Sequence, residues 1–426
     1  MLALAVPVTL ANIATPLLGL VDSTVVGRLG EAHLLAAVAT AATVVNFVFW
    51  LMGFLRMGTA ALVAQAKGAG DERARRLALA RALTLALGLG LAMIALSRPL
   101  GDLGFWLMGA SERVTIAARV YFDVRVWSAP FALINYVVLG ALLGGGRATL
   151  GLVMQAGLNL INAALAILFV MVFQWGLAGA AWATLLAEAL TAAAGVFGFR
   201  LLGWGFTASR EDLFERAGFM RMLAMNRDIM IRTAALLIAF STFTAMGARM
   251  GDVTLAANAV LMTLFTLLAY GLDGFATAAE QMAGQSIGAR DEAGFRASVR
   301  LAGLFCFGLG GLGALAAYAG GGALIDFMTT SEATRVAAKD NLIYAALTPL
   351  LGAPAFLYDG VFIGATWTRA MRSLMLAALA IFLAALLALK GFGATGLWIA
   401  LLIFLAARGA LQAWRFPVLT RRAFAG

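Results

Sequence analysis

The sequence predicts an all-α integral membrane protein with twelve transmembrane helices in two six-helix bundles. Of its 426 residues, 63% are hydrophobic and only 12% are charged, whereas a soluble domain carries roughly 25% charged residues. The apolar residues form twelve stretches near the length of about 20 residues that a membrane-spanning helix needs. The two halves of the chain also repeat polar residues and glycines in one register, which predicts a duplicated bundle.

Breaks in the apolar runs place the expected spans. The longest polar interval follows span six, and Phe214, Phe219 and Met222 within it predict a short amphipathic helix on the membrane surface. We therefore expect an N-terminal bundle over residues 1–205, a cytoplasmic linker over 206–227 and a C-terminal bundle over 228–426. The twelve spans are 2–26, 36–66, 77–97, 116–143, 149–173, 177–199, 228–248, 254–287, 297–321, 338–364, 373–389 and 394–414.

Basic residues predict the orientation of these spans. The loops after the even-numbered spans, together with the C-terminal tail, hold more than twice as many Lys and Arg residues as the other loops. Because loops rich in basic residues stay in the cytoplasm, we expect both termini there, in the inner membrane of a bacterium. The net charge of +10 then reflects topology, so we expect the lipid bilayer as a partner and no nucleic acid.

Residues of the first half recur 220 positions later in the second half. Each half has six spans, so both halves have the same orientation, and we expect a pseudo-two-fold axis along the membrane normal to relate them. Such parallel repeats are typical of transporters that alternate access to a site between the repeats, and we expect a monomer. The recurring residues are Gln65, Gly68, Ala69, Asp71, Glu72, Gly140 and Gly144, which match Gln285, Gly288, Ala289, Asp291, Glu292, Gly360 and Gly364.

The scarcity of cysteine and histidine excludes several classes of protein. Cys306 is the single cysteine and His33 the single histidine, so the sequence offers no disulfide and no cysteine-based metal site. An acid–base enzyme built on histidine has almost nothing to work with. We therefore expect a protein that is not an enzyme, without a cofactor and without a bound metal.

Several motifs resemble those of the multidrug and toxic-compound extrusion (MATE) transporters, in their DinF-like branch. The resemblance implies twelve helices in two bundles and the export of organic cations driven by inward H⁺ or Na⁺. The motifs are Val21-Asp-Ser-Thr-Val-Val-Gly-Arg-Leu-Gly, Phe54-Leu-Arg-Met-Gly-Thr, Asn226-Arg-Asp-Ile-Met-Ile-Arg-Thr, Leu272-Asp-Gly-Phe-Ala, Glu280, and Asp359-Gly-Val-Phe-Ile-Gly-Ala-Thr.

Acidic residues inside the spans are the candidates for the transport site, because a charge near the bilayer centre costs roughly 2.5–3.5 kcal/mol. Asp22 follows Pro7 and Pro16, which permit a bend in the first helix; the resemblance links an acid here to cation coupling. The alternative is that Asp22 only caps the helix near the membrane edge.

Four acids within later spans are further candidates. Asp273 and Glu280 are seven residues apart and so share a helix face, although Glu280 could instead pair with an arginine near the cytoplasmic end. Asp359 lies near Pro349 and Pro354 and suits a cavity lining better than a lipid face. Glu188 in span six is also embedded.

Span five departs from the pattern of the proton-linked members of the family. These members have Asp four residues after Asn, whereas Asn162 is followed by Ala166 here. We expect Asp22 to act without a second carboxylate, with Asn159 and Asn162 as hydrogen-bonding or Na⁺-binding neighbours. Arg56 is the most isolated basic residue of span two, and we expect it to form a structural salt bridge to one of the embedded acids.

Together these features predict a secondary antiporter that exports organic cationic or amphipathic compounds in exchange for inward H⁺ or Na⁺. The alternative from the same superfamily is a flippase for lipid-linked oligosaccharides, which needs a strongly cationic cavity. Embedded acids outnumber embedded bases here, so cation export is preferred. An integral membrane enzyme is the third class, and the lone histidine disfavours it.

Overall fold

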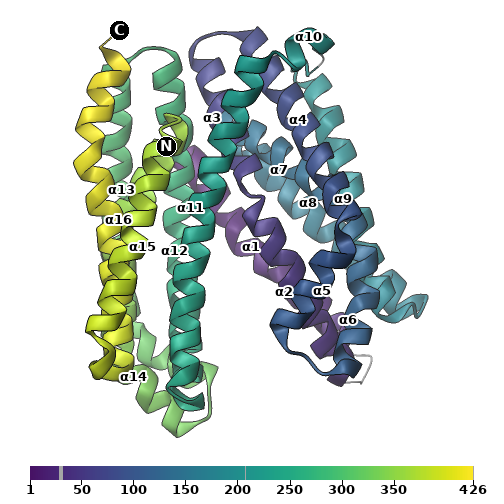
Figure 1. Ribbon diagram of the computed structural model, residues 1–426, viewed down its shortest axis with the longest axis vertical. Helices are drawn as coiled ribbons and strands as arrows, with labels where there is room; N and C mark the ends of the chain where they lie inside the picture. The colour runs from purple at the N-terminus through teal and green to yellow at the C-terminus, as the bar shows by residue number, and fades with distance from the viewer. Residues whose placement is uncertain (28–31, 207, 426) are drawn as a thin grey trace. The chain divides into compact units, whose positions relative to one another are not determined.

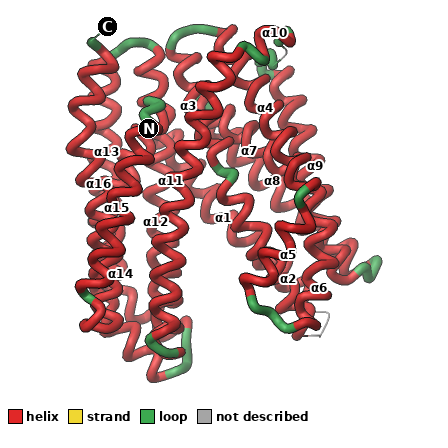
Figure 2. Tube along the Cα trace, in the orientation of Figure 1, coloured by secondary structure: helices red, strands yellow, loops and turns green. Residues whose placement is uncertain are grey.

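The computed structural model describes residues 1–27, 32–206 and 208–425, and the side chains of 14–23, 26, 27 and 32 lie outside the described set. Helices connected by short loops account for the whole described chain, and none of its residues forms a strand (Figure 2). The expected all-α fold class is therefore confirmed.

The first half of the chain forms nine α-helices up to the linker (Figure 1). Spans two and four are each divided into two consecutive helices, and span five ends in a stretch of π-helix, Ile167–Val172. Helix α5 was not predicted, and its 12 residues are too few to cross a bilayer. The helices are α1 (Leu2–Gly27), α2 (Ala32–Leu51), α3 (Phe54–Gly68), α4 (Glu72–Ala95), α5 (Ser97–Met108), α6 (Glu112–Arg125), α7 (Ala129–Gly144), α8 (Ala148–Ala166) and α9 (Gly176–Leu201).

The linker and the second half contain longer and less interrupted helices. Helix α11 begins 12 residues before the expected start of span seven, so part of the predicted linker continues directly into that span. The helices are α10 (Arg210–Leu213), α11 (Arg216–Arg249), α12 (Asp252–Gly288), α13 (Glu292–Met328), α14 (Glu332–Gly364), α15 (Thr368–Ala388) and α16 (Gly393–Phe424).

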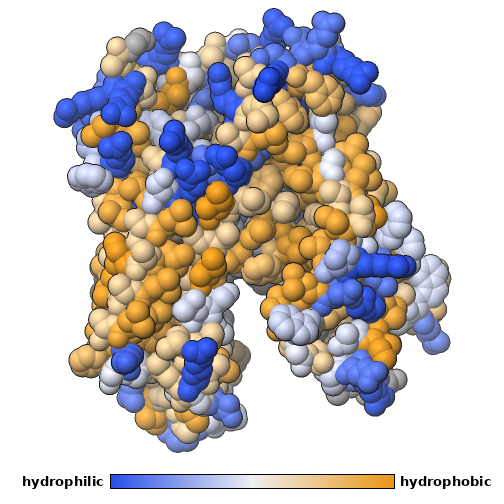
Figure 3. All heavy atoms as spheres, viewed as in Figure 1, coloured by the Kyte–Doolittle hydropathy of each residue, from blue (hydrophilic) through white to orange (hydrophobic). Residues whose placement is uncertain are grey.

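The lengths and surfaces of these helices fit a bilayer. Among the described residues, 11 helices are long and apolar enough to span a membrane, and the described start of α1 adds the shorter apolar helix Leu2–Ile13. Large apolar side chains are exposed along one face of α13, where Leu304, Leu312 and Leu315 are 68–70% exposed. Figure 3 shows apolar residues over the middle of the helices and hydrophilic residues near their ends, as expected of a surface that faces lipid.

The chain divides into two compact units. The C-terminal unit comprises Met1–Thr9, Lys67–Gly70 and Ala224–Gly426, and the N-terminal unit comprises Leu10–Ala66 and Asp71–Leu223. These limits differ from the predicted domains in three places: the first nine residues and the turn after α3 pack with the C-terminal unit, and most of the linker packs with the N-terminal unit. Both chain ends contribute to the packing of the C-terminal unit, where Met1 and Phe424 contact the apolar cluster around Phe295.

The internal repeat is visible in the helix starts. Asp71 caps α4 by accepting a hydrogen bond from the backbone N–H of Ala74, and Asp291 caps α13 by accepting one from Gly294. The two aspartates have almost the same backbone geometry, with φ and ψ of −94° and 93° against −95° and 91°. The recurring acids therefore have the same local task, which is to satisfy the free N–H groups of a helix start.

The recurring glycines mark the same helix contact in each unit. A Cβ at Gly140 or Gly144 in α7 would overlap the carbonyl oxygen of Arg56 or Ala60 in α3. In the second half, a Cβ at Gly360 or Gly364 in α14 would overlap the carbonyl oxygens of Ala276 and Glu280 in α12. The contacted residues, Arg56 and Ala60 in one half and Ala276 and Glu280 in the other, are also 220 positions apart. Small residues let two membrane helices approach closely, so both halves use glycine for the same close contact.

The turns that follow these glycines also repeat. The backbone N–H of Arg147 bonds to the carbonyl of Leu142, and the N–H of Trp367 bonds to that of Phe362. Each turn has one residue in the left-handed region, Gly146 at φ 74° and Thr366 at φ 56°, as in the usual helix ending with such bonds. The Thr366 turn joins α14 to α15.

The linker packs against α4 within the N-terminal unit. The Arg81 guanidinium donates to the carbonyl oxygens of Leu213 and Asp212, at 3.1 and 2.7 Å, and Arg73 pairs with the Asp212 carboxylate at 2.8 Å. The hydrogen bond from Arg73, with one from Ser209, lowers the pKa of Asp212 below its ordinary value. The start of the linker is thus fixed to α4 through backbone and side-chain contacts.

The close approach of α14 to α12 predicts a large effect of one methyl group. We expect Gly360→Ala to lower the free energy of unfolding in detergent by about 1–3 kcal/mol, because the new Cβ meets backbone that cannot rotate away. Gly308→Ala in α13 is the matched control, since its Cβ would meet nothing within 4 Å, and it should be neutral or slightly stabilising. Equal stability of the two variants in denaturant titrations would contradict the contact.

Candidate functional site

A buried ion pair joins α6 to α9 in the N-terminal unit. Arg125 ends α6, and its two terminal nitrogens donate to the two carboxylate oxygens of Glu188 in α9 at 2.8 and 3.1 Å. The residues are 7% and 8% exposed. A bidentate pair of this kind is a strong charge-assisted contact, and it leaves both groups charged without exposing either to lipid.

The neighbours of this pair hold its geometry. Arg125 lies over the ring of Phe49, 5.2 Å from the ring centre, and it also donates to the hydroxyl of Ser128 in the 3₁₀ turn before α7. Asn135 of α7 donates to the backbone carbonyl of Glu188 at 3.0 Å. Four helices therefore converge on one charge pair.

The amides of span five lie in different surroundings. Asn162 is fully buried and donates to the hydroxyl of Thr184 in α9 at 2.8 Å. Asn159 is half-buried and accepts a long hydrogen bond from Gln155. Ala166, which replaces the expected acid, is fully buried. The polar contact between α8 and α9 is thus uncharged.

A second buried cluster joins three helices of the C-terminal unit around Asp359. The Asp359 carboxylate in α14 pairs with Arg232 of α11 and with Arg408 of α16, at 2.6 Å for Arg408. Gln412, one turn after Arg408, donates a hydrogen bond to the other carboxylate oxygen of Asp359 at 2.8 Å. The four residues are 3–7% exposed. One carboxylate and two guanidinium groups give this cluster a net charge of +1.

Another carboxylate lies one turn earlier on α11. Asp228 is buried and pairs with Arg372 at the start of α15, at 2.6 Å. Asp228 and Arg232 are four residues apart and share a helix face. The N-terminal part of α11 is therefore joined by charge pairs to α14 and α15, and Asp359 of α14 also pairs with Arg408 of α16.

Glu188 and Arg408 occupy equivalent positions of the repeat, 220 residues apart. Each lies in the sixth span of its half and pairs with a residue of the fourth span, Arg125 or Asp359. The same two spans are joined in both units, with the charges exchanged between them.

Helix α12 carries the two remaining predicted acids of the C-terminal unit, Asp273 and Glu280. Glu280 is 4% exposed and Asp273 is half-buried. The backbone carbonyl of Glu280 is the group that meets Gly364 of α14. Glu280 therefore lies at the tight contact between α12 and α14, two turns from Asp273.

The remaining predicted residues belong to the first two spans. The side chains of Asp22 and Pro16 lie outside the described residues, and Pro7 is half-buried within α1. Arg56 is half-buried in α3, and its expected salt bridge to an embedded acid stays a prediction, since the Asp22 side chain lies outside the described residues. Within that part of the chain, no group of three or more His, Cys, Asp or Glu residues could hold a metal ion.

A family model described as MatE matches residues 7–168 and again residues 229–389. The chain belongs to the MATE family. Its two matched segments correspond to the two halves of the repeat. The family consists of transporters and not enzymes, so the protein is a multi-pass membrane protein of a family of multidrug-efflux transporters.

Relatives and solved structures agree with this MATE assignment. The chain is 40% identical to DNA damage-inducible protein F of Escherichia coli (strain K12) over 97% of its length and 91% of that protein. It matches the outward-facing conformation of a multidrug resistance MATE family transporter of the MOP superfamily, with a TM-score of 0.90 and 19% identity over 100% and 96% of the two chains. It also matches a MOP superfamily transporter from Pyrococcus furiosus, whose reverse polarity of binding pocket suggests a different function, with a TM-score of 0.86 and 20% identity over 99% and 95%. These likenesses confirm the twelve-helix, two-bundle MATE fold.

Sequence reasoning missed the two arginines that surround Asp359. Arg232 belongs to the motif that begins at Asn226, and Arg408 lies inside span twelve. Each is a basic residue in an apolar run, and such a residue usually has an acidic partner. Their spacing in the sequence does not show that both arginines pair with the same acid. Among the described residues, four acids and three arginines are buried, so buried acids outnumber buried bases by only one. In the Asp359 cluster the bases outnumber the acids.

The net positive cluster predicts that Asp359→Asn is strongly destabilising. Two buried arginines would lose their only carboxylate within the cluster, which costs about 3–5 kcal/mol for a broken buried pair. The control is Asp340→Asn, an exposed acid of the same helix, which should change little.

The unfolding free energies of both variants in detergent test this expectation. The double variant Asp359→Asn/Arg408→Gln should recover part of the loss, because it lowers the net charge of the cluster from +2 in the single variant to the wild-type value of +1. A single variant as stable as the wild type would show that the cluster does not hold α11, α14 and α16 together.

Proposed function

We propose that the protein is a secondary active antiporter that exports organic cationic or amphipathic compounds in exchange for inward H⁺ or Na⁺. The observation that carries the proposal is the MatE match over both halves of a duplicated helical chain. We also propose that it acts as a monomer in the bacterial inner membrane, with both termini in the cytoplasm, as the distribution of basic residues predicts.

The charge pairs narrow the choice of coupling residues. Glu188 and Asp359 each contact at least one buried arginine at 2.8 Å or less, so releasing either acid to bind a cation would leave an arginine without its partner. We assign them the role of holding helices in place. For coupling we propose Asp22, together with Asp273 and Glu280 of α12, on the sequence grounds that place these acids inside membrane spans.

In the C-terminal unit we assign proton exchange to Glu280. It is 4% exposed, whereas Asp273 is half-buried. Its backbone is held against Gly364, so a change in the charge of Glu280 acts directly on the contact between α12 and α14. Asp273, half-buried on the same face, is better suited to attract a cationic substrate.

The Asn162–Thr184 contact supports a limited role for the N-terminal unit in ion coupling. Both groups are neutral and supply oxygen atoms, which can contribute to binding of Na⁺ or a substrate but cannot exchange a proton. Proton coupling in this unit would rest on Asp22 alone, whereas sodium coupling could use Asp22 with the amide oxygens of Asn159 and Asn162.

One observation favours the alternative of a flippase for lipid-linked oligosaccharides. The Asp359 cluster has a net charge of +1, and a basic group suits a pyrophosphate better than a cation. The cluster is buried between three helices of one unit, however, and only a small excess of bases is present there. We therefore keep cation export as the proposal.

Transport in proteoliposomes tests the proposal directly. Ethidium movement would be measured under an imposed H⁺ gradient, an imposed Na⁺ gradient and no gradient, with wild type, Asp22→Asn and Glu280→Gln. We expect gradient-driven transport in the wild type and a loss of about tenfold or more in the acid variants, because the neutral side chains cannot exchange the coupling ion. Glu211→Gln in the exposed linker is the control and should transport normally.

Three results would contradict the proposal. Transport that ignores both gradients would exclude antiport. Full coupled transport in both Asp22→Asn and Glu280→Gln would exclude these residues as the coupling site. Movement of a fluorescent lipid pyrophosphate, without any movement of ethidium, would favour the flippase.

A further inference from the structure

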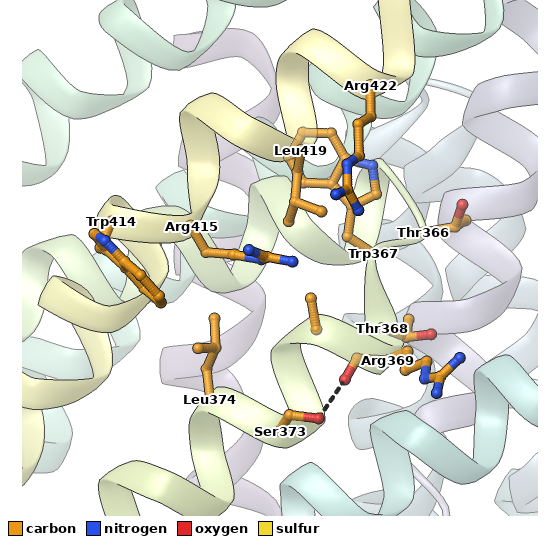
Figure 4. A pocket seen from close by; sticks show the side chains of 11 residues that line it. Thr366, Trp367, Thr368, Arg369, Ser373, Leu374, Trp414, Arg415, Leu419 and Arg422 are labelled. Atoms are coloured by element: carbon orange, nitrogen blue, oxygen red, sulfur yellow. Dashed lines mark hydrogen bonds between the residues drawn. The ribbon is translucent and has the colours of Figure 1, made fainter.

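A pocket of about 600 Å³ lies between the start of α15 and the end of α16 in the C-terminal unit (Figure 4). Three arginines and two tryptophans line it, together with small polar and apolar side chains. In this view Arg415 reaches from α16 into the space between Trp414 and Trp367, and Leu374 borders the space from α15. The pocket contains none of the residues assigned to transport above.

The pocket carries positive charge that no described carboxylate neutralises. Arg369, Arg415 and Arg422 form no ion pair with a carboxylate among the described residues, whereas the neighbouring Arg372 pairs with Asp228 at 2.6 Å. The first turn of α15 also lines the pocket, and it has no acidic residue and no side-chain cap. A helix start adds a partial positive charge, so the field inside the pocket favours an anion.

The pocket lies where a membrane surface is expected. Span twelve was predicted to end at Trp414 and span eleven to begin at Ser373, so the arginines stand just outside the apolar core and Leu374 just inside it. Trp414 is 70% exposed, and tryptophan is enriched at the level of lipid headgroups. The predicted orientation puts this surface on the cytoplasmic side.

From these observations we propose that the pocket binds the headgroup of an anionic phospholipid. The guanidinium groups of Arg415 and Arg422 donate hydrogen bonds to the lipid phosphate, which the planar arginine fork matches well. The acyl chains leave the pocket along Leu374 and the exposed face of Trp414. A basic pocket between membrane helices on the cytoplasmic side is a recognised setting for such lipids.

The apolar side of the pocket favours a lipid over a free anion. A small inorganic ion gains nothing from contact with Leu374 and Trp414, whereas a phospholipid gains both the charge contacts and burial of its chains. The site also involves both of the last two membrane helices, so a bound lipid joins the start of α15 to the end of α16.

Native mass spectrometry of the delipidated full-length protein in detergent measures the binding. The probes are dioleoylphosphatidylglycerol, the zwitterionic dioleoylphosphatidylcholine, and inorganic phosphate as a competitor. We expect the anionic lipid to bind at least about tenfold more tightly than the zwitterionic one. Arg415→Gln/Arg422→Gln should weaken the anionic lipid by about thirtyfold, since each basic residue near a membrane surface contributes on the order of a fivefold gain.

A matched control separates this pocket from general charge. Arg300→Gln/Arg421→Gln removes two arginines that are exposed on the same predicted side and do not line the pocket, and its lipid affinity should stay within about twofold of the wild type. Brominated phosphatidylglycerol at low molar ratio should quench tryptophan fluorescence in the wild type, and Trp414→Phe should remove most of that quenching. Circular dichroism and lipid-free melting curves check that the variants are folded.

Three outcomes would overturn the proposal. The first is an equal loss of lipid affinity in the pocket and control variants, which would indicate diffuse attraction. The second is complete displacement of the lipid by inorganic phosphate with no preference between the two lipids, which would indicate a site for a free anion. The third is unchanged quenching in Trp414→Phe.

Discussion

Charges buried in an apolar scaffold must be balanced within that scaffold, and this constraint organises both units of the protein. An unpaired charge among lipid-embedded helices costs several kcal/mol, so each buried arginine has to meet a carboxylate across a helix interface. Arg125 meets Glu188, and Arg232 and Arg408 meet Asp359. Because the partners come from different helices, each pair also fixes how those helices pack. The glycine contacts add α3 to α7 in one unit and α12 to α14 in the other.

The same constraint divides the embedded acids into two groups. Glu188 and Asp359 are held by arginines and keep the fourth and sixth spans of their halves in register, whereas Asp273 and Glu280 lie on α12 and are the acids that we propose for coupling in the second half. A transporter that changes conformation needs parts that stay rigid as well as parts that respond to an ion. The paired acids suit the first requirement and the α12 acids suit the second. Glu188 and Arg408 occupy equivalent positions but carry opposite charges. The repeat therefore preserved the ion pair between the fourth and sixth spans and not the sign of the charge at each position.

Much of this fold could be predicted from the sequence, because membrane spans and repeats leave local signals. The span positions, the matching caps at Asp71 and Asp291, and the recurring glycines at 140, 144, 360 and 364 all follow from patterns along the chain. The partners of Asp359 could not be predicted in the same way. Arg232 and Arg408 are 127 and 49 residues away from it, and only helix packing brings them together. The divisions of spans two and four were also missed, because neither break interrupts the apolar pattern clearly, and helix α5 was missed because it lies in the interval between two predicted spans.

A double-mutant cycle on Arg125 and Glu188 tests the central claim most directly. The unfolding free energies of Arg125→Met, Glu188→Met and the double variant would be compared with the wild type in one detergent. Each single change should cost about 3–5 kcal/mol, because it leaves a buried charge without a partner, and the double variant should cost much less than the sum. The predicted coupling is therefore at least about 2 kcal/mol. Additive effects, with no coupling between the two residues, would contradict the claim that paired charges hold the helices of each unit together.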